Sequence, residues 1–215
     1  MDLFDLLFAQ QPARQDILKD VILLRRFVVP FQHEILADLV TVIQAAPLRQ
    51  MVTPGGYTMS VTTVSCGDSG WVSDKNGYRY ASLDPLTQKP WPTMPDSFKQ
   101  LAQQAADVAG FADFKPDTCL INRYQVGARM GLHQDKDEQD FSQPIVSVSL
   151  GVTAVFQMGG FVRRDKPLKL PLYHGDVLIW GGESRLRYHG VMPVKAGSHP
   201  ALGEYRVNLT FRKAW

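Results

Sequence analysis

Cysteine is scarce in this sequence, since Cys66 and Cys119 are its only two cysteines in 215 residues. Two cysteines cannot form the disulfide framework of a small secreted domain, so we expect reduced thiols and a cytoplasmic location. Long apolar runs are also missing, which argues against a transmembrane helix and a membrane partner. The N-terminal segment carries Asp2 and Asp5 where a secretory signal would carry Lys or Arg, and we expect mature sequence there.

An excess of either charge is absent as well. The chain has 23 Lys and Arg against 21 Asp and Glu, a net charge of +2. Nucleic-acid binding domains are often strongly basic, so a nucleic-acid function would have to rest on local groups. The apolar fraction of 45% is ordinary for a globular protein, and the length suits one domain, which we expect to be a monomer.

Two stretches in the first half have the period of amphipathic helices. The first, residues 33–46, ends before Pro47 and places five apolar residues on one face: Ile35, Leu36, Leu39, Val40 and Ile43. The second begins at Asp96, the expected N-cap, and ends at Gly110, with a stripe of Phe98, Leu101, Ala105 and Val108. Residues 53–92, between them, are rich in Gly, Ser, Thr, Pro, Tyr and Trp, which predicts short strands and loops.

The second half has the pattern of strands. β-Branched and aromatic residues dominate three segments, PIVSVSLGVTAVFQM (144–158), GDVLIWGG (175–182) and YRVNLTFR (205–212), with Gly or Pro around them. No long helical pattern separates these strands, so an antiparallel sandwich or barrel is favoured over a βαβ sheet. The fold class predicted is therefore α+β, built around a β-barrel.

The last strand alternates in polarity. Arg206, Asn208, Thr210 and Arg212 share one face and the apolar residues share the other. Such a polar face usually lies in water. It could also line the inside of a barrel, where two guanidinium groups would await an anion. The segment CLINRYQ (119–125) shows the same alternation, with an amide and a phenol on one face.

A pair of residues two apart, His133 and Asp135, could grip one metal ion if they lie on a strand. With His189 they would supply two imidazoles and one carboxylate. Non-haem Fe(II) oxygenases use this set because it leaves positions open for a cosubstrate and dioxygen. The HxD spacing often arises by chance, and zinc would explain the three residues equally well. The remaining histidines have no comparable partners: His33, His174 and His199.

The two arginines of the last strand distinguish iron from zinc. An Fe(II) oxygenase needs two electrons, which 2-oxoglutarate supplies by decarboxylating to succinate. This dianion needs fixed positive charge, and guanidinium forks suit carboxylates. Arg206 and Arg212, facing inward from the closing strand, would meet this need, whereas a zinc site leaves both unexplained.

On these residues the sequence resembles the AlkB-type Fe(II)/2-oxoglutarate dioxygenases. HQD (133–135), His189 and RVNLTFR (206–212) match their HxD…H…RxxxxxR pattern. The resemblance extends over about residues 21–212 through longer segments: RQMVTPGGYTMSV (49–61), LINRY (120–124), LHQDKDE (132–138), PIVSVSLG (144–151) and GDV-IWGGESRL-YHG (175–190).

The resemblance implies a fold, a cofactor and two sets of ligands. The fold would be a double-stranded β-helix (jelly roll) at about 116–215, preceded by an extension and nucleotide-recognition lid at about 1–115, in one domain of residues 1–215. Fe(II) would bind to His133, Asp135 and His189. The cosubstrate 2-oxoglutarate would bind to Asn122, Tyr124, Arg206, Asn208 and Arg212, beside O2.

The resemblance also implies oxidative demethylation of N-alkylated bases, such as 1-methyladenine and 3-methylcytosine, in single- or double-stranded DNA and in RNA, with release of succinate, CO2 and formaldehyde. Aromatic residues among Lys75 and Arg79 suit base stacking near phosphates. The residues that would bind the substrate are Thr53, Trp71, Tyr78, Tyr80, Asp137, Glu138 and Arg163. Two alternatives stay open: a 2-oxoglutarate oxygenase acting on protein side chains, and a metal-free or zinc-bearing barrel that only binds nucleic acid.

Overall fold

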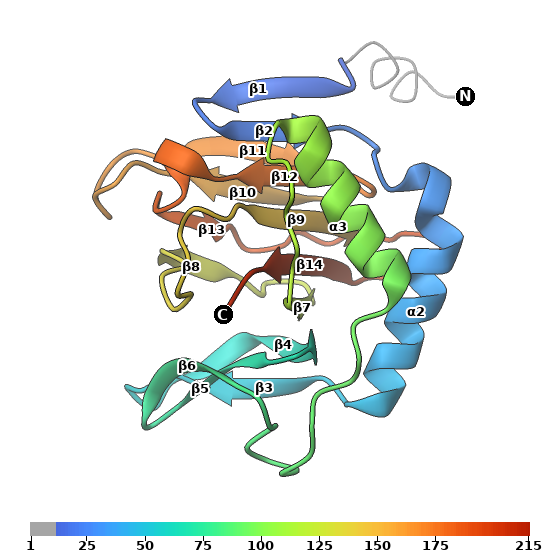
Figure 1. Cartoon of the computed structure of the whole chain (residues 1–215), viewed down its shortest axis with the longest axis vertical. Helices are drawn as coiled ribbons and strands as arrows, with labels where there is room; N and C mark the ends of the chain where they lie inside the picture. The colour runs from blue at the N-terminus through green and yellow to red at the C-terminus, as the bar shows by residue number, and fades with distance from the viewer. Residues whose placement is uncertain (1–11) are drawn as a thin grey trace.

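Residues 12–215 are described by a computed structural model, in which strands form two facing sheets and helices cover one side (Figure 1). Strand pairing is antiparallel in every ladder among these residues. The larger sheet has eight strands, in the order β1 (Arg14–Leu18), β2 (Val21–Leu24), β12 (Val177–Trp180), β9 (Ile145–Gly151), β14 (Arg206–Arg212), β7 (Thr118–Tyr124), β4 (Thr58–Gly67) and β3 (Arg49–Val52).

The smaller sheet closes the barrel. It has four strands, in the order β11 (Leu168–Leu172), β10 (Ala154–Met158), β13 (His189–Val191) and β8 (Met130–His133). A separate hairpin of β5 (Gly70–Asp74) and β6 (Gly77–Ala81) lies beside β3 and β4 at the lower end of the molecule (Figure 1). This is the expected jelly roll, and the hairpin falls in the stretch predicted to form short strands and loops.

Strand β14 lies in the centre of the larger sheet, between β7 and β9. All seven of its residues are buried. Its apolar face packs under the helices, through Val207, Leu209 and Phe211. Its polar face, including Asn208 and Arg212, points to the inside of the barrel and lines a cavity there. The alternation in this strand therefore reflects a polar barrel interior and not a solvent-exposed face.

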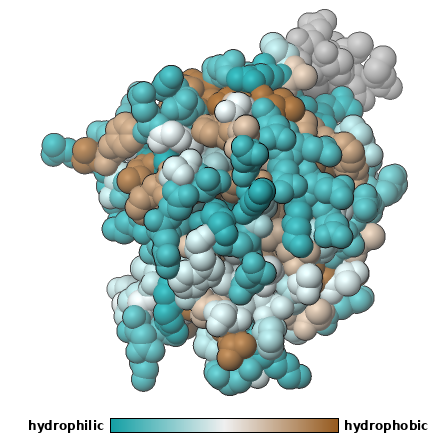
Figure 2. Space-filling model, in the orientation of Figure 1, coloured by the Kyte–Doolittle hydropathy of each residue, from teal (hydrophilic) through white to brown (hydrophobic). Residues whose placement is uncertain are grey.

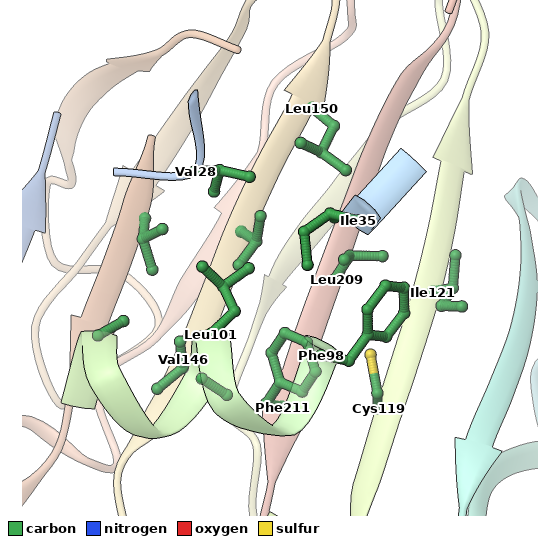
Figure 3. Close-up of a cluster of buried hydrophobic side chains, with 14 of the residues drawn as sticks. Val28, Ile35, Phe98, Leu101, Cys119, Ile121, Val146, Leu150, Leu209 and Phe211 are labelled. Carbon is green, nitrogen blue, oxygen red and sulfur yellow. The ribbon is translucent and has the colours of Figure 1, made fainter. Parts of the chain in front are cut away.

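Two helices cover the outer face of the larger sheet: α2 (Gln32–Ala45) and α3 (Asp96–Ala109) (Figure 1). Phe98 and Leu101 of α3 pack onto the apolar side chains of β9 and β14, and Phe98 meets Phe211 edge-to-face at 5.9 Å (Figure 3). Burying each such side chain stabilises the fold by about 1.5–3 kcal/mol. This layer holds β14 in place from behind.

The predicted helix patterns were correct in position but wrong in detail. Val40 and Val108, assigned to the apolar stripes, are 53% and 45% exposed, because each lies outside the face that its helix buries. Asp96 is the first helical residue and does not cap the helix. Pro95 holds the N-cap position, and its side chain makes no capping hydrogen bond. Gly110 ends the helix in the left-handed conformation, at φ 95°, as its position predicted.

The surface over the helices is mainly hydrophilic (Figure 2). In residues 12–215, no helix combines the length and the apolarity needed to cross a bilayer. Cys66 and Cys119 are free, buried and directly opposite each other on β4 and β7. Residues 1–11, on which the expectation of mature N-terminal sequence rests, lie outside the described residues.

Candidate active site

Three side chains of the predicted metal set converge inside the barrel. His133 ends β8 and His189 begins β13, and the two residues are register partners, so their rings lie 4.4 Å apart between centroids. Asp135 places Oδ1 3.5 Å from Nε2 of His133 and Oδ2 3.7 Å from Nε2 of His189. The ligand atoms of the three residues lie within 4.8 Å of one another, close enough to share one metal ion.

The backbone position of Asp135 differs from the expectation. His133 and Asp135 were expected on one strand, but β8 ends at His133 and Asp135 lies in the loop that follows. Its carboxylate is placed by contacts instead. Arg212 Nε donates to Asp135 Oδ2 at 2.8 Å, and Arg185 Nη1 donates to the Asp135 carbonyl at 2.8 Å. The loop is therefore held by two buried arginines from other parts of the chain.

Both histidines present the correct nitrogen for metal binding. Nδ1 of His133 lies 2.8 Å from the carbonyl of Gly131, and Nδ1 of His189 lies 3.0 Å from the carbonyl of Arg187. A carbonyl only accepts, so each Nδ1 carries the proton and each Nε2 keeps a free lone pair. This backbone contact selects the tautomer that a metal ligand requires.

The protonation states of His133 and Asp135 also suit a metal. Burial, together with a smaller contribution from the neighbouring His189, lowers the pKa of His133 to about 4, so the ring is neutral near pH 7. Burial would raise the pKa of Asp135, but Arg212 and His189 outweigh it and hold this pKa well below its usual range. A metal ligand must be unprotonated, and the pKa values of His133 and Asp135 meet this requirement near pH 7.

Arg206 is buried in the barrel, and part of its guanidinium is unpaired. Its side chain contacts the ring of Tyr124 at 5.0 Å, and its Nη2 donates to Ser149 Oγ at 3.1 Å. Among residues 12–215, its Nε and Nη1 have no hydrogen-bond partner, and the same is true of Nη1 of Arg212. Burial lowers the pKa of Arg206. Unpaired buried donors are costly, and a carboxylate ligand would satisfy them.

These free donors are a test of whether a dianion fits. A keto diacid needs charged donors at both ends, and the barrel provides one guanidinium beside Asp135 and a second at Tyr124. Asn208 is fixed by donating Nδ2 to Ser147 Oγ and the Val148 carbonyl. Oδ1 of Asn122 has no hydrogen-bond partner in the described part of the chain. The residues present therefore fit both a divalent metal and 2-oxoglutarate.

A cavity of about 750 Å³ opens above these residues. Its wall includes the metal set and most of the residues expected to bind 2-oxoglutarate: Asn122, Tyr124, Asn208 and Arg212. Arg206 is not part of the wall. Its guanidinium lies 5.0 Å from the ring of Tyr124, which is part of the wall. The volume is typical of a small-molecule pocket, so the cavity can take a cosubstrate and one flipped base.

Five of the seven expected substrate residues line this cavity: Thr53, Trp71, Tyr78, Asp137 and Arg163. Trp71 and Tyr78 stack at 5.5 Å with 13° between their planes. Trp71 Nε1 donates to Asp137 Oδ2 at 2.8 Å, which fixes the edge of the indole. The hairpin β5–β6 thus presents a stacked aromatic pair beside a carboxylate.

The other two expected substrate residues lie below the cavity wall. Tyr80 and Glu138 are 7% and 6% exposed, and Tyr80 Oη donates to Glu138 Oε1 at 2.6 Å. Burial raises the pKa of Tyr80 well above its usual value. The structure brings these two residues to each other and to Arg212, and it does not bring them to the cavity.

Sequence reasoning missed several neighbours of the metal set. Trp180 lies 4.8 Å from the ring of His189, and Phe156 stacks on the same ring at 5.9 Å. Arg185, whose side chain is 3% exposed, joins Glu138 to the backbone of Asp135. The aromatic residues were hidden in apolar strand patterns. A charged residue between the turn GGES and His189 was the only signal for Arg185.

Comparisons with known proteins agree with this geometry. The family described as 2OG-Fe(II) oxygenase superfamily matches residues 20–212. The "Alpha-ketoglutarate-dependent dioxygenase AlkB" of Salmonella typhimurium (strain LT2) is 54% identical over 99% of this chain and 98% of its own length, and that of Escherichia coli (strain K12) is 52% identical over the same shares. The solved structure of OsALKBH1 is 31% identical, with a TM-score of 0.80 over 93% of this chain and 99% of its own. This chain belongs to the 2OG-Fe(II) oxygenase superfamily and, within it, to the AlkB family.

Proposed function

We propose that this enzyme removes alkyl groups from the ring nitrogens of nucleobases, such as 1-methyladenine and 3-methylcytosine. As a member of its superfamily it uses Fe(II), 2-oxoglutarate and O2. The observation that carries the proposal is that one cavity is lined by two different sets of residues. The metal set lies at its floor, and a stacked aromatic pair with a carboxylate lies in its wall.

The floor of the cavity would hold the cofactor and the cosubstrate. His133, Asp135 and His189 would bind Fe(II) through two Nε2 atoms and a carboxylate oxygen. Arg206 and Arg212 would pair with the two carboxylates of 2-oxoglutarate, helped by Asn122, Tyr124 and Asn208. When bound, the iron couples decarboxylation of 2-oxoglutarate by O2 to hydroxylation of the alkyl carbon, which yields succinate, CO2 and, from a methyl group, formaldehyde.

The outer wall would hold the base. Alkylation of the ring nitrogen leaves the base cationic, and a cation over an aromatic face gains about 0.5–2 kcal/mol. Trp71 would supply that face, His133 would close the stack, and Asp137 would attract the charge. Tyr78, Thr53 and Arg163 would contact the sugar and the phosphates. An alkylated base pairs poorly, so extruding it from the stack costs less than extruding a normal base.

The chain would do little proton chemistry of its own. The carbonyl contacts of the two histidines keep their protons on Nδ1, away from the metal side. Arg212 keeps Asp135 ionised and oriented. The apolar rings around His189 exclude water from the reacting carbon.

The wider setting is also part of the proposal. We place the catalytic core at about residues 116–215 and the extension and recognition lid in the preceding part of the chain. The enzyme would act as a monomer on single- or double-stranded DNA, and on RNA. The two free buried thiols support a reducing, cytoplasmic location.

An alkylated trinucleotide tests the proposal. The anaerobic protein is loaded with Fe(II) and 2-oxoglutarate, then given oxygen and a trinucleotide that contains 1-methyladenine. We expect formaldehyde and succinate in equal amounts, and none with the unmethylated trinucleotide. If methylated peptides but not the oligonucleotide raise succinate formation, the substrate is a protein. If iron has no effect on either product, the barrel is only a binding module.

A further inference from the structure

Glu138 is a buried carboxylate that occupies neither the metal set nor the cavity wall. Its side chain is 2% exposed. Three buried groups surround it. Tyr80 Oη donates to Oε1 at 2.6 Å, Arg185 Nη2 lies 3.0 Å from Oε2, and Arg212 Nε lies 3.4 Å from Oε1. A carboxylate taken this far from water needs such partners, so its position is closely specified.

Two of these partners also hold Asp135. Arg212 donates to the Asp135 carboxylate, and Arg185 donates to the Asp135 carbonyl. The cluster thus contains two carboxylates and two guanidinium groups, and it is neutral as a whole. Without Glu138, both arginines would turn to the single carboxylate that remains. Glu138 therefore leaves Oδ1 of Asp135 free to face His133, while Oδ2, which accepts from Arg212, lies nearest His189.

The third partner belongs to the recognition hairpin. Tyr80 of β6 is the register partner of Trp71 of β5. Trp71 donates to Asp137 and Tyr80 donates to Glu138, so two neighbouring acids bind the two members of one cross-strand pair. We call residues 135–138 the clasp loop, because it carries Asp135 at one end and grips the hairpin at the other. A two-stranded hairpin is marginal alone, so these contacts matter to its placement.

We propose that Glu138 is a positioning residue that couples the recognition hairpin to the metal site. Its contacts with Arg185 and Arg212 orient the Asp135 carboxylate. Its hydrogen bond with Tyr80 positions the hairpin against the barrel. The coupling is reciprocal: metal and 2-oxoglutarate order the hairpin, and a substrate seated on the hairpin strengthens metal binding. The part that concerns substrate rests on the proposed function, whereas the part that concerns metal and hairpin does not.

Two variants separate the two halves of this role. Glu138→Gln removes the charge and keeps the size, so it affects Asp135 and the hairpin together. Tyr80→Phe removes only the hydroxyl, so it affects the hairpin alone. Asp140→Asn is the matched control, because Asp140 is an exposed acid in the same segment whose carboxylate accepts from the Ser142 N–H.

The readouts are metal affinity and hydrogen exchange, with Mn(II) in place of Fe(II) to avoid turnover. In the wild type, Mn(II) with 2-oxoglutarate should slow exchange of the amides of residues 70–81. Glu138→Gln should weaken Mn(II) binding about tenfold or more, the usual effect of losing a residue that orients a ligand, and abolish this protection. Tyr80→Phe should leave Mn(II) affinity within about twofold and still abolish the protection.

Several results would overturn the proposal. One is Mn(II) affinity and hairpin exchange in Glu138→Gln that match Asp140→Asn. Another is faster exchange in β9 and β12 as well as in the hairpin, which would show general destabilisation and no specific coupling. Neither readout uses nucleic acid, so a failed demethylation assay with intact coupling would reject the proposed substrate and leave the role of Glu138 standing. If Glu138→Gln does not fold, Tyr80→Phe still tests the hairpin half.

A turn beside the cavity carries a separate feature. Phe161 and Val162 are 53% and 51% exposed, in the loop between β10 and β11. The turn is closed by the Val162 N–H, which donates to Asp165 Oδ2 at 3.0 Å, and the same carboxylate lies so close to Gly160 that a Cβ there would be only 2.1 Å from the oxygen. The guanidinium of Arg187 lies 4.7 Å from the Phe161 ring and is itself held by Ser184 Oγ and the Gly159 carbonyl. An apolar ring is thus held in place at the surface.

The charge around this ring fits a nucleic acid. Arg163, the next residue but one, lines the cavity, and Arg164 and Lys166 are exposed. Exposed aromatic rings among basic groups stack on unpaired bases while the charges meet the phosphates. We infer that Phe161 stacks on the nucleotide that flanks the alkylated base. This inference rests on the proposed function and names a contact beyond the flipped base.

Phe161→Ala tests the inference, with Leu168→Ala as control because Leu168 is a comparably exposed apolar residue on β11. With a methylated trinucleotide, Phe161→Ala should raise KM about tenfold, the loss expected for one base–aromatic stack. With the free methylated nucleoside, which has no flanking base, it should have no effect. Equal effects on both substrates, or an effect no larger than that of Leu168→Ala, would reject it. If the wild type releases formaldehyde from neither substrate, the proposed function fails instead.

Discussion

The floor of the cavity and the β5–β6 hairpin differ in what holds their side chains. On the floor, Asp135, His189 and Arg212 are nearly buried, and each has polar partners from other parts of the chain. In the hairpin, Tyr78 is 49% exposed and the ion pair Arg79–Asp74 is internal to the hairpin. Its polar links to the barrel include those to Asp137 and Glu138. The metal floor is thus fixed by buried polar partners, whereas the hairpin combines a buried side, on which Ser73 Oγ donates to the Val52 carbonyl, with exposed side chains such as Tyr78.

The largest expected effect comes from replacing the carboxylate of the metal set. Asp135→Asn keeps the size but removes the charge that binds the metal and balances Arg212. We expect turnover to fall more than about a hundredfold, beyond the range for a residue that only orients a ligand. Succinate formation and Mn(II) titration calorimetry measure this. His199→Gln, which changes a histidine outside the metal set, should keep normal metal affinity. Wild-type metal binding by Asp135→Asn would remove Asp135 from the ligands.

A change at the far end of the floor should affect 2-oxoglutarate alone. Arg206→Met removes the guanidinium and keeps most of the volume. Two charge-assisted hydrogen bonds of about 1.5–3 kcal/mol each would be lost, so KM for 2-oxoglutarate should rise about a hundredfold or more. Metal affinity should not change. The free energy of unfolding should stay level or rise, because an incompletely paired buried charge is removed. An unchanged KM would contradict our placement of the cosubstrate.

A smaller effect is expected from the hairpin. Trp71→Ala removes the stacking face and should weaken binding of a methylated oligonucleotide by about tenfold, the loss of one stacked base. The KM for 2-oxoglutarate should remain that of the wild type, because the floor does not depend on this ring. Fluorescence anisotropy and steady-state kinetics measure the two quantities. Normal repair of 1-methyladenine by Trp71→Ala would show that another residue stacks on the base.

The sequence predicted that His133, Asp135 and His189 meet, and the structure brings their ligand atoms within 4.8 Å of one another. Strand alternation placed the polar face of β14, and tautomer and charge then followed from the fold. The choice between a wet face and a barrel interior could not be made from β14 alone. It depended on β7 and β9 pairing on both sides of the strand.

The hairpin was harder to predict because its contacts come from residues distant in the chain. Tyr80 and Glu138 are 58 positions apart, and no periodicity in either segment indicates that they meet. The resemblance to the AlkB family implied that both residues bind the substrate, which predicted a place in the cavity wall. In the structure both side chains are buried against each other and do not line the cavity. The predicted burial of Val40 and Val108 was wrong because a helical pattern of apolar residues does not show which of them the sheet will cover.

The smallest expected effect lies outside both regions, at His174. Burial lowers its pKa to about 4, and the nearby His199 contributes. Its Nδ1 accepts from the Gly151 N–H at 3.0 Å, which requires that nitrogen to be unprotonated. The unfolded chain therefore binds the extra proton first. Stability should be constant above about pH 7 and should fall as the pH drops from 6.5 towards 4.

Denaturant unfolding at pH 7 and pH 5 checks this. His174→Gln should reduce the loss between these two values by on the order of 1 kcal/mol relative to the wild type. An identical pH dependence in the variant would show that His174 is as easily protonated in the folded protein as in the unfolded chain.

The most direct test of the account is the position of the metal and the cosubstrate. Crystals grown without oxygen and soaked with Fe(II) and 2-oxoglutarate should give one anomalous iron peak, bonded to His133, Asp135 and His189. The distal carboxylate of 2-oxoglutarate should meet Arg206, and its keto-acid end should lie beside Arg212. An iron peak that lacks any of these three ligands, or a cosubstrate bound away from both arginines, would contradict the account.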